Sequence, residues 1–574
     1  MRRVWKARTK LAEDLPTQLL RSRGLLDEES IEDFLNPRYE KSHSPLLLTG
    51  MDRAVARVQQ AVARDEQITV YADYDADAVT AAAVLLRYFQ KIGYPKANYY
   101  IPDRNSEGYG VSTDAVKRLA EQGTKLIITV DCGINAFDAI DLATFLGIDV
   151  VVTDHHQLTA GIPRAAAVVN PHQPGDQYPF KDLTGVGVAF KLVQALIKSV
   201  IARNEVTKQS QGSEIATRPM GARNDNSISG FEKWLLDFVA IGTVADCQSL
   251  LGENRIFVKW GLQVLAKTRW RGLKQLTKLA GIFGQKLDAY HLGFIIAPRL
   301  NAAGRIEHAN SALELLLTDD DAEAELLAEK LSELNHHRQQ LTETVLSEAR
   351  EQLTAVSDKK ILLASGSNWP KGIVGLVAGK LTEEFYRPVL ILERGEEEAT
   401  GSARSIAGFN IVEAIGQSRD ILLRYGGHAQ AAGFTLRTSE IDAFHKNLLK
   451  YAENILTEEA LLPVLFYDWQ SNLGDFTSDF LDFLEKFTPF GIGNPRPRVR
   501  VNEITPRFPS AIGNEGKHLR FYAGDFACIG FNLGYWADKL KQEEKIDIVC
   551  EPQYNEWNGE RKIQLKIIDL DHSK

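Results

Sequence analysis

Short apolar stretches rich in β-branched residues alternate with amphipathic stretches from about residue 51 onward. Four apolar stretches predict strands, and the three amphipathic stretches between them predict helices. The strands are predicted at 67–73, 97–102, 125–131 and 149–156, and the helices at 78–93, 112–123 and 135–147. Strands that alternate with helices in this way pair in parallel and are covered on both faces. The pattern therefore predicts an α/β domain built on a parallel sheet.

The rest of the chain divides into regions of different pattern. A long amphipathic helix is predicted at 319–356, and a second α/β segment follows it. Short alternating strands near the C-terminus are typical of a small β-barrel. We expect five regions: a helical extension at 1–48, an α/β domain at 49–318, the connecting helix at 319–356, a second α/β domain at 357–456 and a barrel at 457–574. A polar stretch at about 204–230 lacks periodicity and predicts a mobile surface insertion in the first domain.

Acidic residues recur at four places in the first α/β domain. Each place is predicted to lie at, or just past, the carboxyl end of an apolar strand. They are Asp73, Asp75 and Asp77 in "VYADYDADAVT", Asp131 in "IITVDCG", Asp154 with His155 and His156 in "VVTDHH", and Asp246 in "AIGTVADCQ". Ligands bind outside the carboxyl ends of the strands in an open parallel sheet. We therefore expect the four places to meet in one crevice.

Several carboxylates that lie close together cannot all stay ionised without cations. Carboxylate oxygens with one or two imidazoles suit Mn²⁺ or Mg²⁺, and the imidazoles favour Mn²⁺. Two ions held ~3.5–4 Å apart clamp a phosphate and activate a water for in-line attack. A single acidic triplet is often only a polar turn, but four acidic places in register predict a hydrolase of phosphoester or phosphoanhydride bonds.

Composition narrows the class of protein further. The chain has 44% hydrophobic and 25% charged residues, as in a globular protein, and its net charge is −9. That charge argues against a protein that coats polyanions, although a nucleic-acid enzyme with a local basic channel still fits. The four cysteines form no CxxC motif, which excludes zinc-finger spacing and fits a reducing compartment. With no secretory signal and no apolar run of ~20 residues, we expect a cytoplasmic protein without a membrane partner.

Arginines beside small residues recur outside the acidic places. Glycine lets a backbone approach an anion, and arginine binds phosphate through two parallel hydrogen bonds. The candidates for phosphate binding are Arg104, Arg299, Asn301, Arg305, Ser402, Arg404 and His428. Each stretch alone is more often a loop with a surface salt bridge, and His428 alone is more often a structural histidine.

Taken together, these motifs resemble the DHH phosphoesterase superfamily. The Asp-His-His at 154–156 carries the resemblance in the first domain, and "GSARS" and "GGHAQAAGF" carry it in the second, DHH-associated domain. The stretches "PRLNAAGR", "NWPKGIVGLVAGKL" and "FGIGNPRP" are similar to the members of the superfamily that are exonucleases specific for single strands. The resemblance covers nearly the whole chain except the insertion.

The resemblance implies a two-metal exonuclease that digests single-stranded DNA from the 5′ end to mononucleotides, in DNA repair and recombination. It implies two α/β lobes joined by a long helix and followed by a barrel of the OB type. The implied metal ligands are Asp75, Asp77, Asp131, His155 and Asp246, with Asp73 as a further candidate. Asp131 would bridge the ions, His156 would lie near the scissile phosphate, and Asp154 would complete the catalytic group. The arginines, Asn301, Ser402 and His428 would hold DNA phosphates. The implied enzyme is a monomer, with a single-strand-binding protein and a helicase as further partners.

Two positions depart from the family pattern. Ala78 stands where glycine is usual, and "CQSL" follows Asp246 where a hydrophobic residue and proline are common. Neither change removes a predicted ligand. Two other functions stay open: a phosphodiesterase acting on short oligoribonucleotides or cyclic dinucleotides, and a non-catalytic DNA-binding scaffold. The first needs only the two α/β lobes, and inactive scaffolds lose metal ligands, so the extra regions and the full ligand set favour the exonuclease.

Overall fold

A computed structural model describes residues 3–104, 106–108, 110–210, 228–540, 544–557 and 559–573. The chain forms two compact units. The smaller unit contains Met1–Lys6 and Glu333–Phe466, and the larger unit contains Ala7–Ser332 and Tyr467–Lys574. Of the predicted insertion at 204–230, residues 211–227 lie outside the described residues, and its first residues continue helix α7 as far as Ser210.

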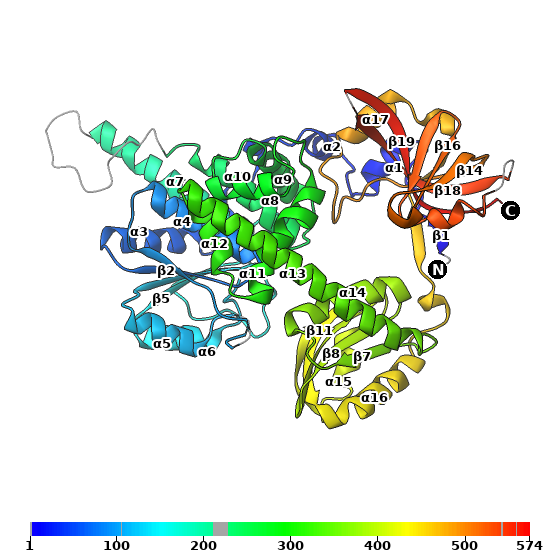
Figure 1. Cartoon of the computed structure of the whole chain (residues 1–574). Helices are drawn as coiled ribbons and strands as arrows, with labels where there is room; N and C mark the ends of the chain where they lie inside the picture. Colours follow the sequence, from blue (N-terminus) through cyan, green and yellow to red (C-terminus); the bar gives the residue numbers. More distant parts are fainter. Residues whose placement is uncertain are drawn as a thin grey trace. The chain divides into compact units, whose positions relative to one another are not determined.

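A five-stranded parallel sheet forms the centre of the first α/β domain, as predicted (Figure 1). Its strands lie in the order β3-β2-β4-β5-β6. They are β2 (Ile68–Ala72), β3 (Ala97–Tyr100), β4 (Leu126–Val130), β5 (Asp149–Thr153) and β6 (Ala167–Val169). Helices cover both faces: α3 (Met51–Ala63), α4 (Ala76–Lys91) and α7 (Gly185–Ser210) lie on one, and α5 (Thr113–Glu121) and α6 (Phe137–Phe145) on the other.

The strand order reverses between β2 and β4. The chain leaves β2 toward β3 on one side and leaves β4 toward β5 on the other. Such a switch point opens a crevice outside the carboxyl ends of the two strands, because the connections there diverge. The first two acidic places, after β2 and after β4, therefore flank this crevice.

Helix α7 contains an 18-residue stretch, Gly185–Ala202, that is long and apolar enough to cross a membrane. This corrects the expectation that no such run exists. Of that stretch, 72% is buried inside the fold, as in the core helix of a globular domain. Its length and composition are therefore explained by packing against α3, α4 and α8.

A group of helices follows the sheet in the larger unit. They are α8 (Leu236–Ala245), α9 (Gly252–Leu265), α10 (Arg271–Leu279), the π-helical turn η5 (His291–Ile296), α11 (Ala297–Ile306) and α12 (Asn310–Leu317). The stretch before Asp246, predicted to be a strand, is helix α8. A short run that is apolar at every position has no periodicity, so it cannot distinguish a buried strand from a buried helix.

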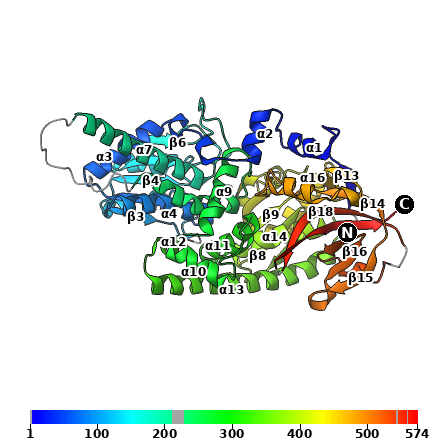
Figure 2. The same cartoon turned by 90° about the horizontal axis from the view of Figure 1, so that it is seen from above.

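Helix α13 (Asp321–Thr354) is one continuous helix that lies within the predicted 319–356 (Figures 1 and 2). The second α/β domain follows with a five-stranded sheet in the order β10-β11-β9-β8-β7. Its strands are β7 (Leu362–Gly366), β8 (Val389–Arg394), β9 (Glu398–Arg404), β10 (Leu422–His428) and β11 (Ala431–Arg437). Its helices are α14 (Lys371–Phe385), α15 (Ile411–Gly416) and α16 (Ile441–Glu453).

The C-terminal domain is a seven-stranded sheet in the order β13-β14-β18-β19-β17-β16-β15. The strands are β13 (Trp469–Ser471), β14 (Val499–Ile504), β15 (Arg507–Ile512), β16 (His518–Ala523), β17 (Phe526–Gly530), β18 (Ile546–Trp557) and β19 (Glu560–His572), with helix α17 (Ser478–Glu485) beside them. Alternate residues of these strands enclose one apolar core, as predicted for a small barrel-like β domain.

The N-terminal extension is not purely helical, contrary to the prediction. It contains strand β1 (Val4–Ala7), which pairs with β12 (Val464–Tyr467), before helices α1 (Leu15–Arg21) and α2 (Glu28–Leu35). The buried Arg255 of α9 donates hydrogen bonds to the carbonyls of Phe34 at 2.7 Å and of Lys486 and Phe487 at 2.8 Å. One guanidinium thus joins the extension and the C-terminal domain to the helices of the larger unit.

Candidate active site

The loop after β2 is held by the first turns of two helices. Asp75 caps α4, because its Oδ1 accepts hydrogen bonds from the backbone nitrogens of Asp77 at 2.9 Å and Ala78 at 3.1 Å. The buried Asp77 accepts from the backbone nitrogens of Gly185 at 2.7 Å and Val186 at 3.0 Å, at the start of α7. Helix N-termini stabilise negative charge, so this loop keeps its carboxylates in place.

Asp131 follows β4 in a strained conformation. Its φ is +59°, a region that residues with a Cβ rarely occupy outside functional sites. A Cβ added to Gly185 would lie 2.4 Å from the Asp131 Cβ, so only glycine fits beside it. The close approach of α7 therefore depends on that glycine and buries the Asp131 carboxylate.

Three polar residues follow β5: Asp154, which hydrogen-bonds to its neighbours, and the imidazoles His155 and His156. Asp154 Oδ1 accepts from the His156 Nδ1 at 2.8 Å and from the His155 backbone nitrogen at 2.7 Å, and its Oδ2 accepts from the Ile134 backbone nitrogen at 2.9 Å. Asp154 thus holds the His156 ring and the neighbouring backbone in place. The His155 and His156 rings lie side by side, with centroids 4.5 Å apart. This happens because β5 ends at Thr153 and the chain turns there.

His155 lies among three carboxylates. Its Nε2 is 3.0 Å from Asp131 Oδ1, 3.7 Å from Asp246 Oδ2 and 4.0 Å from Asp77 Oδ2. Asp246 arrives at the C-terminus of helix α8 and not at a strand end. Within the part of the chain that the structure describes, two groups of side chains are close enough to hold a metal ion, one of Asp131, His155 and His156, and one of Asp77, His155 and Asp246.

Burial shapes the protonation of these groups. Desolvation, together with the charges of Asp246 and Asp75, raises the pKa of Asp77, and desolvation with the charge of Asp77 raises the pKa of Asp131. Burial and the Asp75 charge raise the pKa of Asp246 to about 6 and that of Asp73 to about 8. So many perturbed carboxyls in one place are the mark of a functional site.

The two histidines respond in opposite directions. Burial and the neighbouring His156 lower the pKa of His155 to about 4, so this ring is neutral near pH 7. Although burial lowers it, the hydrogen bond and charge of Asp154 raise the pKa of His156 to about 9. The same hydrogen bond helps to lower the pKa of Asp154 despite its burial.

Four buried atoms in this cluster lack hydrogen-bond partners: Asp73 Oδ1, Asp131 Oδ1, His155 Nε2 and Asp246 Oδ2. The His155 ring donates to the Leu183 backbone, so its Nε2 carries a lone pair. That lone pair faces the Asp131 oxygen at 3.0 Å, and a divalent cation bound beside these two atoms would satisfy both. The oxygen-rich set with one imidazole fits Mn²⁺ or Mg²⁺.

Two predicted phosphate-binding arginines lie beside the acidic loop. The Arg104 guanidinium lies over the Tyr74 ring, 4.9 Å from its centroid. Its positive charge acts to lower the pKa of Asp73, against the larger effect of burial. The charge of Arg305 reaches Tyr74 as well. Because Tyr74 stands between Asp73 and Asp75, both cations border the carboxylate cluster.

Asn301 has a different role from the predicted one. Its Oδ1 accepts a hydrogen bond from the Ala76 backbone nitrogen at 2.8 Å, so it holds the acidic loop. A Cβ added to Gly304 would lie 2.5 Å from the Tyr74 carbonyl oxygen, which explains the glycine. Arg299, on the same helix, donates to the Ile295 carbonyl at 2.6 Å, and burial lowers the pKa of its guanidinium.

The remaining phosphate-binding candidates lie in the smaller unit. Ser402 and Arg404 belong to strand β9, where a loop was expected, and Arg404 Nη1 donates to Ser402 Oγ at 3.0 Å. His428 ends β10 and is exposed. Ala431 of β11 pairs with His428 of β10 on one side and with Arg404 of β9 on the other. The side chains of His428 and Arg404 therefore lie in one row across the three strands.

The sequence did not reveal Asn170 as a member of the site. Its side chain, fully buried just after β6, donates to the His156 carbonyl at 3.0 Å and accepts from the His172 backbone nitrogen at 2.7 Å. The available signal was a polar residue directly after the apolar run "AAAVV". Asn170 therefore marks one more strand end at the same edge of the sheet.

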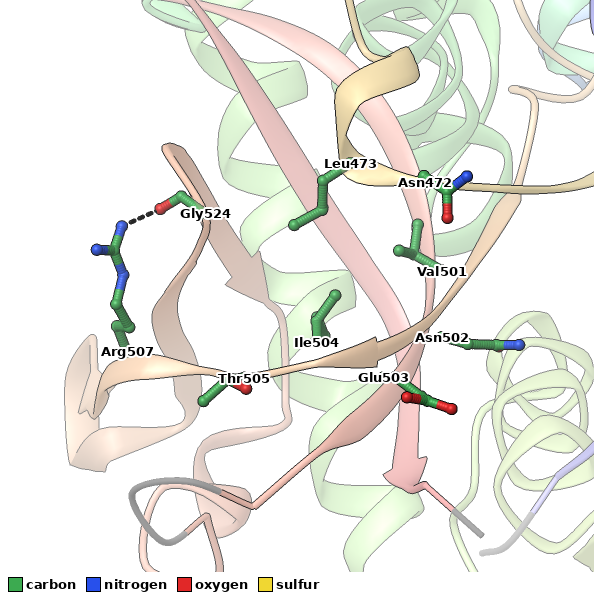
Figure 3. A pocket seen from close by; sticks show the side chains of 9 residues that line it. All are labelled: Asn472, Leu473, Val501, Asn502, Glu503, Ile504, Thr505, Arg507 and Gly524. Atoms are coloured by element: carbon green, nitrogen blue, oxygen red, sulfur yellow. Dashed lines mark hydrogen bonds between the residues drawn. The ribbon is translucent and has the colours of Figure 1, made fainter.

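A hollow of about 490 Å³ lies in the C-terminal domain (Figure 3). It forms where β14 departs from regular pairing between Val501 and Ile504. The Arg507 guanidinium at its edge donates to the Gly524 carbonyl. Its lining includes one carboxylate, Glu503, and no histidine or cysteine, so it does not supply the chemistry of the metal cluster.

Comparisons with known proteins agree with this geometry. The chain matches the DHH family N-terminal domain over residues 67–243, the DHHA1 domain over residues 358–454 and the RecJ OB domain over residues 467–569. It is 39% identical to the single-stranded-DNA-specific exonuclease RecJ of Bacillus subtilis over 97% of this chain and 67% of that protein. Identity to the Escherichia coli RecJ is 32%, over 97% and 96% of the two chains.

The fold is also similar to solved structures of RecJ from Thermus thermophilus. The form in complex with Mn²⁺ gives a TM-score of 0.81 at 28% identity and covers 100% of this chain and 80% of that one. The form in complex with Mg²⁺ gives a TM-score of 0.74 at 27% identity and covers 100% and 79%. Three domains match the family models, and the sequence similarity extends over nearly the whole chain. The chain therefore belongs to the RecJ family of single-stranded-DNA-specific exonucleases.

Proposed function

We propose that the chain is a two-metal exonuclease that hydrolyses single-stranded DNA from the 5′ end to 5′-mononucleotides. One observation carries the proposal: the buried lone pair of His155 Nε2 faces Asp131 Oδ1 at 3.0 Å, among further carboxylates without hydrogen-bond partners. The cluster lies at the switch point of the sheet, where ligands bind in this class of fold.

The proposed ligands are Asp77, Asp131, His155 and Asp246, with Asp73 and Asp75 completing the acidic shell. Asp131 contributes to one metal group with the two histidines, and His155 links it to the group of Asp77 and Asp246. Two divalent ions in such a site polarise the phosphoryl oxygens and lower the pKa of a bound water. The residues of the chain bind the ions, exclude bulk water and fix the position of the phosphodiester.

Polar side chains of both units would hold the strand. Asp154 fixes the ring of His156 at 2.8 Å, which presents the other edge of the imidazole toward the substrate phosphate. Arg104 and Arg305 supply positive charge beside the acidic loop, and a guanidinium matches two phosphate oxygens at once. Ser402, Arg404 and His428 offer a second group of phosphate donors in the smaller unit.

The DNA specificity of the proposal rests on the family and on the third domain. The region that matches the RecJ OB domain is an additional β domain, and OB folds hold single strands through stacking and backbone contacts. We also propose that the protein acts as a cytoplasmic monomer, because one chain supplies every proposed ligand. A single-strand-binding protein and a helicase are its proposed partners, since both control access to single strands.

The test uses oligonucleotides labelled at either the 5′ or the 3′ end, single-stranded or in a blunt duplex, with Mn²⁺. A 5′ label should appear at once as a mononucleotide, whereas a 3′ label should shorten stepwise, and the duplex should resist. Mononucleotide release from the 3′ end, internal cleavage or equal attack on the duplex would refute the proposal.

A further inference from the structure

One segment of this acidic chain is strongly basic. Residues 254–306 contain ten lysines and arginines against a single acidic residue, Asp288, in a chain whose net charge is −9. The segment runs from within α9 to the end of α11, the helix that holds the acidic loop through Asn301. A local excess of positive charge beside a phosphodiesterase cluster favours a polyanionic ligand.

An aromatic pair stands exposed within this segment. Tyr290 is 60% exposed and Phe294 is 71% exposed, and their rings stack with centroids 5.0 Å apart and an angle of 23° between planes. Leu292 and Ile296 of the same π-helical turn are fully buried. The turn is therefore anchored by its buried apolar side chains, and the stacked aromatic pair stays exposed to solvent.

The segment that carries the pair contacts both helix α8 of the metal cluster and the C-terminal domain. Toward the cluster, a Cβ added to Gly293 would lie 3.3 Å from Val244 Cγ1, two residues before Asp246. Toward the C-terminal domain, Lys286 Nζ forms an ion pair with Glu485 of α17 at 3.2 Å. All of these residues belong to the larger unit.

We propose that Tyr290 and Phe294 form a stacking platform for a base of the single strand, on the way between the metal cluster and the C-terminal domain. The inference rests on the proposed function and adds a specific substrate subsite to it. Every base has a π face, so aromatic stacking holds a single strand without regard to sequence. A base paired in a duplex cannot offer that face, so the platform also contributes to selection of single strands.

The experiment tests whether each aromatic ring stacks on one particular base of the strand. Single abasic sites are placed in turn at each of the first ten positions of a 20-nucleotide strand, and the initial rate of cleavage is measured with the wild type and with Phe294→Ala and Tyr290→Ala. For the wild type, KM should rise at one or two adjacent positions by about 5-fold or more, the amount typical of one lost stack. In Phe294→Ala, KM for the intact strand should already be raised, and the abasic site at that position should add nothing. Phe294→Trp should restore the wild-type pattern.

Phe145→Ala is the matched control, because Phe145 is an exposed aromatic residue, 85% accessible, on α6 outside the basic segment. It should behave as the wild type at every position. If the wild type cuts single strands but no position couples to Tyr290 or Phe294, the platform is refuted while the proposed function stands. If the wild type cuts no single strand, the proposed function fails, and fluorescence anisotropy with the same abasic series decides whether the pair binds a base.

Discussion

The Asn301 side-chain oxygen accepts a hydrogen bond from the Ala76 backbone nitrogen at 2.8 Å, and so fastens helix α11 to the acidic loop. The loop contains Asp73, Asp75 and Asp77, and Gly304 one turn further along α11 allows the same helix to touch the Tyr74 carbonyl. Residues that orient metal ligands without contacting the metal commonly change its affinity when replaced. The pair thus connects a helix from the end of the domain to its first metal-binding motif.

We predict that Asn301→Ala weakens Mn²⁺ binding by about 10–100-fold, because the loop loses the acceptor that fixes its backbone. Isothermal titration calorimetry of metal-free protein measures this directly. The exposed Asn36→Ala, on the N-terminal extension, should leave the affinity unchanged. Unchanged Mn²⁺ affinity in Asn301→Ala, with only phosphate affinity reduced, would restore Asn301 to the phosphate-binding group.

Asp131→Asn should abolish most of the hydrolysis and yet stabilise the metal-free fold. Asparagine tolerates a positive φ such as the +59° of Asp131, and it removes one charge from a buried carboxylate cluster. Loss of a metal ligand should lower the rate about 10³-fold, the equivalent of several kcal/mol. The melting temperature without metal should rise by about 2 °C or more, whereas Mn²⁺ should raise it less than in the wild type. A lower melting temperature in metal-free Asp131→Asn would show that the carboxylate stabilises the fold.

Arg404→Ala should lower kcat/KM on single strands by about 10–100-fold, since a charge-assisted contact contributes ~1.5–3 kcal/mol. Arg404 belongs to the smaller unit and is not a proposed metal ligand, so Mn²⁺ affinity should not change. Arg419→Ala, an exposed arginine in the same domain, is the control. A large fall in melting temperature with kcat/KM preserved would instead assign Arg404 to the structure of the domain, through its hydrogen bond to Ser402.

A buried carboxyl far from the cluster makes stability depend on pH. Burial raises the pKa of Asp237 to about 7, although Thr268 Oγ1 and Trp270 Nε1 donate to it at 2.8 Å and 3.1 Å. An acid whose pKa is raised on folding stabilises the fold at low pH, and it loses that contribution as the pH rises from its unfolded pKa near 4 through its folded pKa. Asp237→Asn keeps an uncharged acceptor, so its melting temperature should gain on the wild type between pH 5 and 8. The exposed Asp420→Asn should show no such trend, and a parallel course of the Asp237→Asn and wild-type curves would contradict the assignment.

The parallel sheet and most of its acidic edge could be predicted from the sequence, because strand periodicity and strand-end carboxylates are local signals. Asp246 was placed correctly in the cluster for an incorrect reason. The run before it is apolar at every position, and only packing on α4 and α9 decides that it is a helix. Asn301 could not be assigned, because the acceptor it offers to Ala76 depends on a contact across 225 positions of the chain. The strand that contains Arg404 could not be predicted for the same reason, because its pairing with Ala431 is a long-range contact.

The central claim is that the cluster around Asp131 and His155 binds two divalent metal ions, and a titration of metal-free protein with Mn²⁺ tests it most directly. Electron paramagnetic resonance of free Mn²⁺ counts the bound ions without reference to activity. We predict two ions per chain in the wild type, and fewer ions or much weaker binding in Asp131→Asn and His155→Ala, both of which should remain folded by circular dichroism. A wild type that binds no Mn²⁺, or folded variants that bind two ions as tightly as the wild type, would contradict the account.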